Sequence, residues 1–131
     1  MSFMERILRR AGTPRKPNLD DGQAAESLAA DFLAAQGLTV VAKNYRVRGG
    51  EIDLVCEERG SWVFVEVRLR RHRDFGGAAA SITRPKQQRL VLAARHWLME
   101  HGDRPCRFDC ILFDALEIAR AEWITNAFDA D

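Results

Sequence analysis

Asp53 and Glu66 are two acidic residues in neighbouring apolar runs of the sequence, and together they could bind a metal ion. The runs Glu51–Cys56 and Trp62–Leu69 alternate in the way that is typical of β-strands. Two carboxylates that face each other across a sheet destabilise it unless a cation lies between them. Mg²⁺ prefers such oxygen ligands, polarises phosphate groups and lowers the pKa of an attacking water. The pair therefore predicts metal-dependent phosphodiester chemistry.

A two-residue turn at Arg59-Gly60 would make the two acids direct cross-strand neighbours, because counting outward from such a turn pairs Asp53 with Glu66. The same alternation directs Asp53 away from the face of Ile52, Leu54 and Cys56, and it puts Glu66 and Arg68 opposite Val63, Val65 and Val67, a face that we expect to be core. Arg68 could hold a phosphate oxygen with its planar fork of donors. The alternative is that both acids are strand-end residues paired with nearby arginines, and spacing alone leaves this open.

Glu26 and Lys86 lie on two predicted helices and are further candidates. A helical wheel places Glu26 at the margin of the buried stripe, so it could reach the acid pair. Lys86 falls in the first turn of the second helix, where the amide dipoles also favour phosphate. An edge salt bridge and an exposed lysine are the respective alternatives.

The segment from Arg68 to Arg95 contains eight basic residues and one acidic residue. Phosphate is the natural complement of such a segment, although a solvated basic face is the alternative. With the acid pair beside it, we expect DNA as the partner, while RNA stays open. The residues expected to bind nucleic acid are Arg70, Arg71, Arg73, Arg84, Lys86 and Arg89.

Two helices and five strands are predicted along the chain. The order is helix, three strands, helix, strand, strand, which predicts an α/β fold with a mixed central sheet flanked by helices. The predicted helices run from Asp20 or Asp21, as N-caps, to Gln36 and from Arg84 to about Gly102. The predicted strands are Leu38–Tyr45, Glu51–Cys56, Trp62–Leu69, Phe108–Phe113 and Ile118–Ile124.

A chain of 131 residues fits a single domain. Residues 1–19 are rich in arginine and contain two prolines, which predicts a flexible basic arm before one domain at 20–131. The apolar fraction is 47%, but no run approaches the roughly 18 apolar residues of a membrane span. Because charges interrupt the first residues, no secretory signal is indicated, and we expect a cytoplasmic protein.

Around the acid pair the sequence resembles the YraN family, endonuclease-like bacterial proteins that are similar to Holliday-junction resolvases and to the restriction-endonuclease-like PD-(D/E)XK superfamily. The resemblance extends from about Asp21 to the C-terminus. It rests on the segments Gly22-Gln23-Ala24-Ala25-Glu26, Gly50-Glu51-Ile52-Asp53-Leu54-Val55, Phe64-Val65-Glu66-Val67-Arg68, Phe75-Gly76-Gly77, Lys86 and Arg107-Phe108-Asp109.

The resemblance implies a set of roles at the acid pair. Asp53 and Glu66 would be the metal-binding acids, with the backbone carbonyl of Val67 as another ligand of Mg²⁺ or Mn²⁺ and Glu26 as the helix-borne acid. Arg68 stands where the superfamily usually has lysine, and an arginine stays protonated, so it can neutralise charge but hardly accept a proton. Generation of hydroxide by the metal alone, substitution by Lys86 and a catalytically weak centre all stay open.

We therefore expect a metal-dependent endonuclease acting on DNA, with branched or otherwise structured DNA among its candidate substrates. A nucleic-acid-binding module that keeps the nuclease fold without cutting is the alternative, motivated by Arg68. An interaction protein without nucleic-acid affinity is a third reading. The resemblance implies a homodimer by analogy alone. Asp109 enters a buried strand, so we expect it to be structural and to orient a basic side chain.

Overall fold

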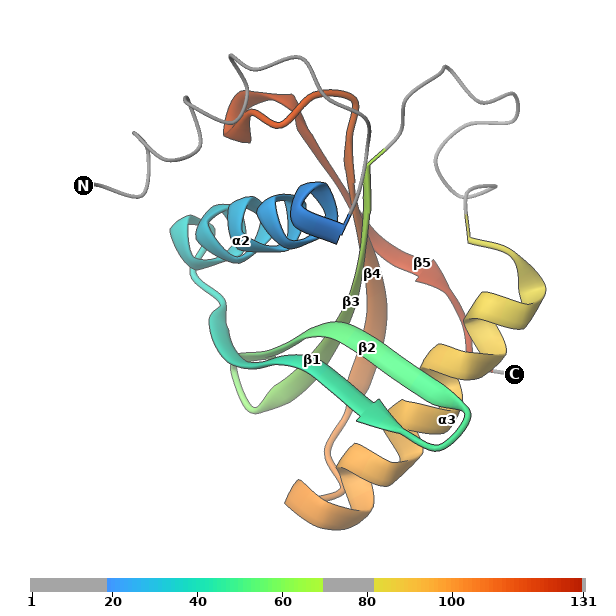
Figure 1. Cartoon of the computed structure of the whole chain (residues 1–131). Coiled ribbons are helices and arrows are strands. Elements are labelled where there is room, and N and C mark those ends of the chain that lie inside the picture. Colours follow the sequence, from blue (N-terminus) through green and yellow to red (C-terminus); the bar gives the residue numbers. More distant parts are fainter. Residues whose placement is uncertain (1–18, 70–81, 131) are drawn as a thin grey trace.

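A five-stranded mixed sheet lies between two helices in the computed structural model, which describes residues 19–69 and 82–130 (Figure 1). The strand order is β1-β2-β3-β4-β5, with α2 against one face and α3 against the other. This arrangement confirms the predicted α/β fold. Along the chain the elements are α2 (Leu19–Ala35), β1 (Thr39–Val47), β2 (Gly50–Glu58), β3 (Ser61–Leu69), α3 (Arg84–His101), β4 (Cys106–Phe113), the 3₁₀ helix η2 (Ile118–Arg120) and β5 (Ala121–Phe128).

The hairpin between β2 and β3 has the two-residue turn predicted from the sequence. Arg59 and Gly60 both have positive φ, 50° and 82°, the combination that matches the twist of the flanking strands. Pairing then runs outward from Glu58 and Ser61. The predicted register of the hairpin is thus confirmed.

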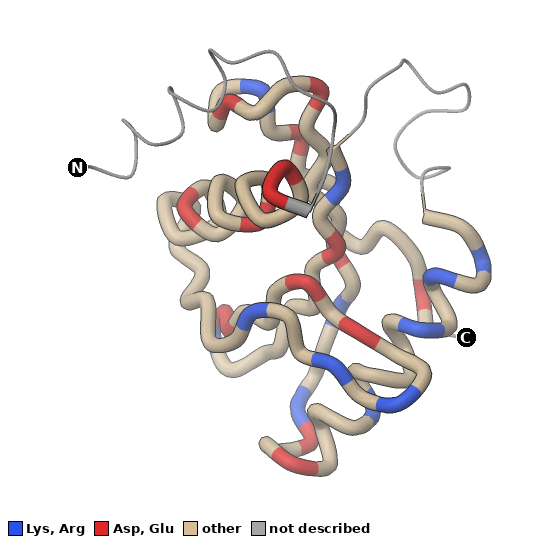
Figure 2. Tube along the Cα trace, viewed as in Figure 1, with Lys and Arg blue, Asp and Glu red and all other residues tan. Residues whose placement is uncertain are grey.

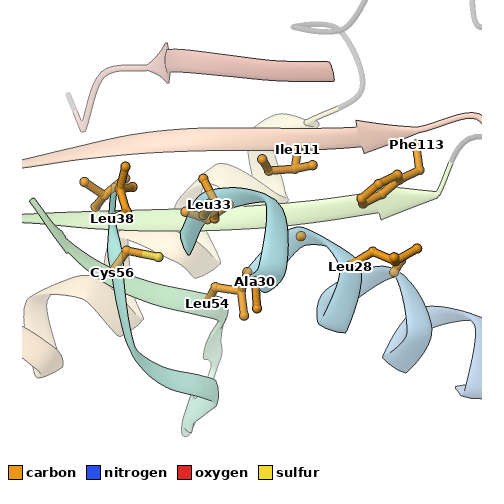
Figure 3. Close-up of a cluster of buried hydrophobic side chains, with 12 residues drawn as sticks. Leu28, Ala30, Leu33, Leu38, Leu54, Cys56, Ile111 and Phe113 are labelled. Carbon is orange, nitrogen blue, oxygen red and sulfur yellow. The ribbon is translucent and has the colours of Figure 1, made fainter. Parts of the chain in front are cut away.

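Both faces of β3 are buried, because α2 and α3 cover opposite sides of the sheet. On the α2 side, Val63 and Val65 join a cluster that also contains Leu28, Leu33, Leu54 and Phe113 (Figure 3). On the α3 side, Trp62 and Phe64 pack with Leu90, Trp97 and Leu112. The prediction that only the valine face is core was therefore incomplete. Ile52 also departs from its predicted grouping with Leu54 and Cys56, because it packs in the α3-side cluster.

Helix α3 connects two parallel strands, β3 and β4, as a crossover of this kind requires. Thr83 caps its start, since the Thr83 hydroxyl accepts a hydrogen bond from the Lys86 backbone N–H. Its end follows at Gly102, whose φ of 121° favours glycine. The helix predicted from Arg84 to about Gly102 is confirmed. The cap at Thr83 places Lys86 in the first turn of α3, from which Lys86 pairs with Glu66 on β3.

Two predictions about element ends were wrong. Asp20 and Asp21 do not cap the first helix, because α2 already includes Leu19 and the two acids lie in its first turn. The last strand does not begin at Ile118, because residues 118–120 form η2 and β5 starts at Ala121 and continues to Phe128. Neither α2 nor α3, among the residues described, is long and apolar enough to cross a membrane.

Gly50 brings the start of β2 against the backbone of α3. A Cβ added there would lie 2.5 Å from the Arg89 carbonyl oxygen and 3.0 Å from the Ala93 nitrogen, so backbone would have to move. Gly50→Ala is expected to lower the free energy of unfolding by about 1–3 kcal/mol in urea titration. Gly22→Ala is the control, because nothing lies within 4 Å of its added Cβ and alanine favours a helix. Equal stability of the two variants would contradict this packing.

Candidate metal centre

The acid pair lies where β2 and β3 separate. Their ladder of paired residues ends at Leu54 and Val65, one position before Asp53 and Glu66. Beyond that point a side chain of β2 contacts the backbone of β3: the Asp53 Oδ2 accepts a hydrogen bond of 2.8 Å from the Val67 N–H. The two acids still lie close together, since the Asp53 carboxyl group raises the pKa of Glu66 both as a hydrogen-bond partner and by its charge. They are close as predicted, but as neighbours at a fork of the sheet and not as members of the ladder.

Glu66 is the most perturbed acid of this centre. Its side chain is only 10% exposed, and burial, the hydrogen bond to Asp53 and the Asp53 charge raise the pKa of Glu66 to about 9. The charges of Lys86 and Arg68 act in the opposite direction. At neutral pH the pair therefore keeps a proton between its two carboxyl groups. A divalent cation at this point would take the place of that proton.

Glu66→Gln tests this interpretation without a metal. The folded protein holds the Glu66 proton up to about pH 9, whereas the unfolded chain releases it near the ordinary value of 4.5. Between these values the folded state binds more protons, so the free energy of unfolding falls as pH rises. Because the glutamine side chain would not ionise, the variant is expected to lose this decline and to be more stable at pH 8 by roughly 1–3 kcal/mol in EDTA. Urea titrations from pH 5 to 9 measure it.

Asp31→Asn, in the middle of α2, is the matched control because Asp31 is exposed to solvent. It should leave the pH dependence of stability unchanged. If Glu66→Gln and the wild type lost stability in parallel between pH 5 and 9, the shared proton would be disproved.

Glu26 is brought to the same centre by α2. Burial raises the pKa of Glu26, and the charges of Asp53 and then Glu51 raise it further, while a hydrogen bond from Asn44 lowers it. Asn44 lies in β1 opposite Asp53, because its two neighbours in β1 pair with Leu54 and Ile52. Its φ of 52° is a left-handed conformation that asparagine tolerates better than most residues. The sequence analysis missed Asn44, and an asparagine within a valine-rich strand was the available signal.

Basic side chains approach the acids from α3. The Lys86 Nζ lies 3.7 Å from Glu66 Oε2, and an Arg89 Nη2 lies 3.9 Å from Glu51 Oε1. With Leu90 these four residues line a small pocket of about 10 Å³. Lys86 and Arg89 are thus beside the acids, and Arg68 is close enough for its charge to lower the pKa of Glu66.

Arg84, another member of the predicted nucleic-acid-binding set, does not line this pocket. Arg84 lines a separate pocket of about 230 Å³ on α3, together with Arg95 and the C-terminal residues Asp129 and Ala130. Arg70, Arg71 and Arg73 lie outside the described residues, as do the Phe75-Gly76-Gly77 segment and residues 1–18 of the arm predicted at 1–19.

The donor set suits Mg²⁺ or Mn²⁺ better than a cation that needs many protein ligands. Within residues 19–69 and 82–130, no three acidic, histidine or cysteine side chains converge as a metal-binding group. The fork instead offers Asp53, Glu66 and the backbone of Val67, whose N–H and carbonyl point to the same edge of the strand. Mg²⁺ commonly binds through one or two carboxylates and keeps several waters, so the residues present fit it.

Asp109 has the structural role that the sequence predicted. It is 1% exposed, and both of its oxygens accept hydrogen bonds of 3.1 Å from the Arg107 Nε. Trp123 Nε1 and the Asn126 N–H donate the remaining bonds. Arg107 in turn reaches Glu58 at 2.9 Å. This network ties β4 to β5 and to the end of β2.

Comparison with known proteins gives matches along most of the chain. The model of a family described as "Uncharacterised protein family UPF0102" matches residues 25–113. A UPF0102 protein of Methylobacillus flagellatus is 54% identical over 109 residues, which cover 83% of this chain and 96% of that protein. A UPF0102 protein of Nitrosomonas europaea is 56% identical over 109 residues, covering 82% and 92%. The matched region includes Glu26, Asp53, Glu66 and Lys86, although the descriptions assign no activity.

Proposed function

Because the chain belongs to the uncharacterised protein family UPF0102, we propose its function from the geometry of the acid pair: a Mg²⁺- or Mn²⁺-dependent endonuclease that hydrolyses phosphodiester bonds of DNA. The observation that carries the proposal is the Asp53–Glu66 fork: Asp53 accepts the Val67 N–H beside the buried Glu66, and the Lys86 Nζ lies 3.7 Å from Glu66 Oε2. Two carboxyl groups this close, one of them buried, repel each other when both are ionised, and this repulsion costs stability. A divalent cation bound between the two carboxylates would offset this repulsion.

The residues around the fork supply what phosphodiester hydrolysis needs. A bound divalent cation would polarise the scissile phosphate and favour ionisation of the attacking water. Asp53, Glu66 and the Val67 carbonyl would hold that cation, and Glu26 would accept a hydrogen bond from water on the α2 side. Lys86 would meet a phosphate oxygen at the start of α3, where backbone amides add positive potential. The likeness to the YraN family and the PD-(D/E)XK nucleases supports the same assignment.

Lys86 supports one of the three explanations of how the centre works with Arg68 in place of lysine. The Lys86 ammonium lies 3.7 Å from Glu66, so a second cation is present where a substitute lysine would be needed. Its side chain is 44% exposed, so solvent and a bound strand can reach it. In the proposal Lys86 therefore takes the phosphate-facing role, while Arg68 neutralises charge on β3.

The first experiment incubates purified protein with labelled branched, nicked, linear and single-stranded DNA in Mg²⁺, Mn²⁺ or EDTA. The proposal expects cleavage that needs a divalent cation. The alternative function is a binding module that keeps the fold, and it is favoured by Arg68, which cannot act as a base. That alternative expects salt-sensitive DNA binding that survives Asp53→Ala, with no cleavage in any condition. Absence of both cleavage and binding would contradict the two functions together.

A further inference from the structure

Glu51 holds two arginines that come from different elements. The Arg46 Nε, on β1, lies 3.5 Å from Glu51 Oε2, and the Arg89 Nη2, on α3, lies 3.9 Å from Glu51 Oε1. Both guanidinium groups stay open to solvent, with side chains 71% and 56% exposed. Two planar donor forks, one from the neighbouring strand β1 and one from the helix α3, are therefore gathered on a single carboxylate.

The turn between β1 and β2 brings these arginines together. Gly50 sits against the Arg89 carbonyl so closely that a Cβ would overlap it at 2.5 Å. The residue before Glu51 is thus in contact with the helix turn that carries Arg89. Basic positions of α3 and of the β1–β2 turn lie on the same side of the molecule (Figure 2). The pairing of Arg46 with Arg89 follows from backbone packing and does not depend on the ion pairs alone.

Stability does not account for this arrangement. Exposed ion pairs contribute about 0–1 kcal/mol each, and two arginines near one carboxylate also repel each other. The group carries two positive charges and one negative charge, so most guanidinium donors have no acceptor in Glu51. It also adjoins the acid pair, because Glu51 and Arg89 line the same small pocket as Glu66 and Lys86. A group with spare donors beside a metal centre is suited to an anionic ligand.

We propose that Arg46 and Arg89 together bind one phosphate of the DNA backbone, the phosphate next to the one held at the acid pair, and that Glu51 positions the two arginines for it. A phosphate offers oxygens to both forks at once, and Arg binds such groups through two parallel hydrogen bonds. This inference rests on the proposed function, since it takes the acid pair as the place where the backbone is cut. It adds Arg46, which the sequence analysis did not select.

The test measures binding of duplex DNA in EDTA, where no cleavage occurs, as a function of KCl concentration. Arg46→Ala and Arg89→Ala are each expected to weaken binding about tenfold. Because both side chains hold the same phosphate, the double variant should be weaker by much less than a hundredfold. The slope of log Kd against log [KCl] should change by about 0.9 in each single variant and by about the same amount in the double variant.

Arg95→Ala is the matched control, since Arg95 lies on the same helix, is exposed and lines the other pocket. Its effect should be smaller than that of Arg89→Ala and additive with Arg46→Ala. A slope change of about 1.8 in the double variant would mean two separate phosphates and would overturn the proposal. The proposal would also be overturned if the wild type bound DNA in a salt-sensitive way and both single variants bound it with the same affinity. The proposed function would stand in that case. A wild type that binds no DNA would overturn both.

Discussion

Replacing Asp53 with alanine is expected to reduce the rate of metal-dependent DNA cleavage by roughly 10³-fold or more, because a lost metal ligand removes several kcal/mol of charge stabilisation. Glu66→Ala should have an effect of similar size. The two changes should not add in the double variant, since either one already dismantles the same centre. Initial rates on labelled DNA at saturating Mn²⁺ measure all three.

Loss of the fold must be separated from loss of the centre. Asp53→Asn keeps an oxygen that can accept the Val67 N–H, so it should stay folded while cleavage is lost. Asp31→Ala changes an exposed acid on α2 and should leave the rate within about twofold of the wild type. Normal cleavage by Asp53→Asn or by Glu66→Ala would refute the assignment of the acid pair.

Asp109→Ala is expected to have the largest effect on stability, lowering the free energy of unfolding by about 3–5 kcal/mol. The change would leave the Arg107 Nε, the Trp123 indole and the Asn126 backbone N–H without their acceptor, while Arg107 would keep its ion pair with Glu58. Unpaired buried donors and a partly buried charge carry a large desolvation cost. Urea unfolding monitored by tryptophan fluorescence and by circular dichroism measures the loss.

Two control variants make the stability prediction specific. Asp109→Asn keeps the shape and an acceptor oxygen but removes the charge, so its loss should be clearly smaller than that of the alanine variant. Asp114→Ala breaks a surface ion pair with Arg120 and should cost less than about 1 kcal/mol. A loss of only this size for Asp109→Ala would show that the network is not needed for folding.

Local sequence signals were sufficient for the hairpin that carries the acid pair. The Arg59-Gly60 turn fixes the register because a two-residue loop between alternating runs leaves one pairing, which the structure has. Helix α3 was equally accessible, since Pro85 at its start and Gly102 after its end mark its limits. Alternation also brought Asp53 and Glu66 to the same place.

Features that depend on how distant elements meet were not accessible. The β2–β3 ladder ends at Leu54 and Val65, and the Val67 N–H donates to the Asp53 side chain, whereas alternation alone predicts a continuous ladder. Ile118 was predicted to start the last strand, but residues 118–120 form η2 and β5 begins only at Ala121. Arg46 and Arg89 meet at Glu51 through the pairing of β1 with β2 and the packing of Gly50 on α3, and no spacing within one segment encodes that contact.

The central claim, that the Asp53–Glu66 fork binds a divalent cation, is tested most directly by calorimetric titration of the protein with Mn²⁺ at pH 7 and pH 9. One site is expected, with an affinity that rises with pH because the cation displaces the proton that keeps the pKa of Glu66 near 9. Asp53→Asn and Glu66→Gln should bind no Mn²⁺ at this site. Failure of the wild type to bind Mn²⁺, or equal binding by both variants, would contradict the account.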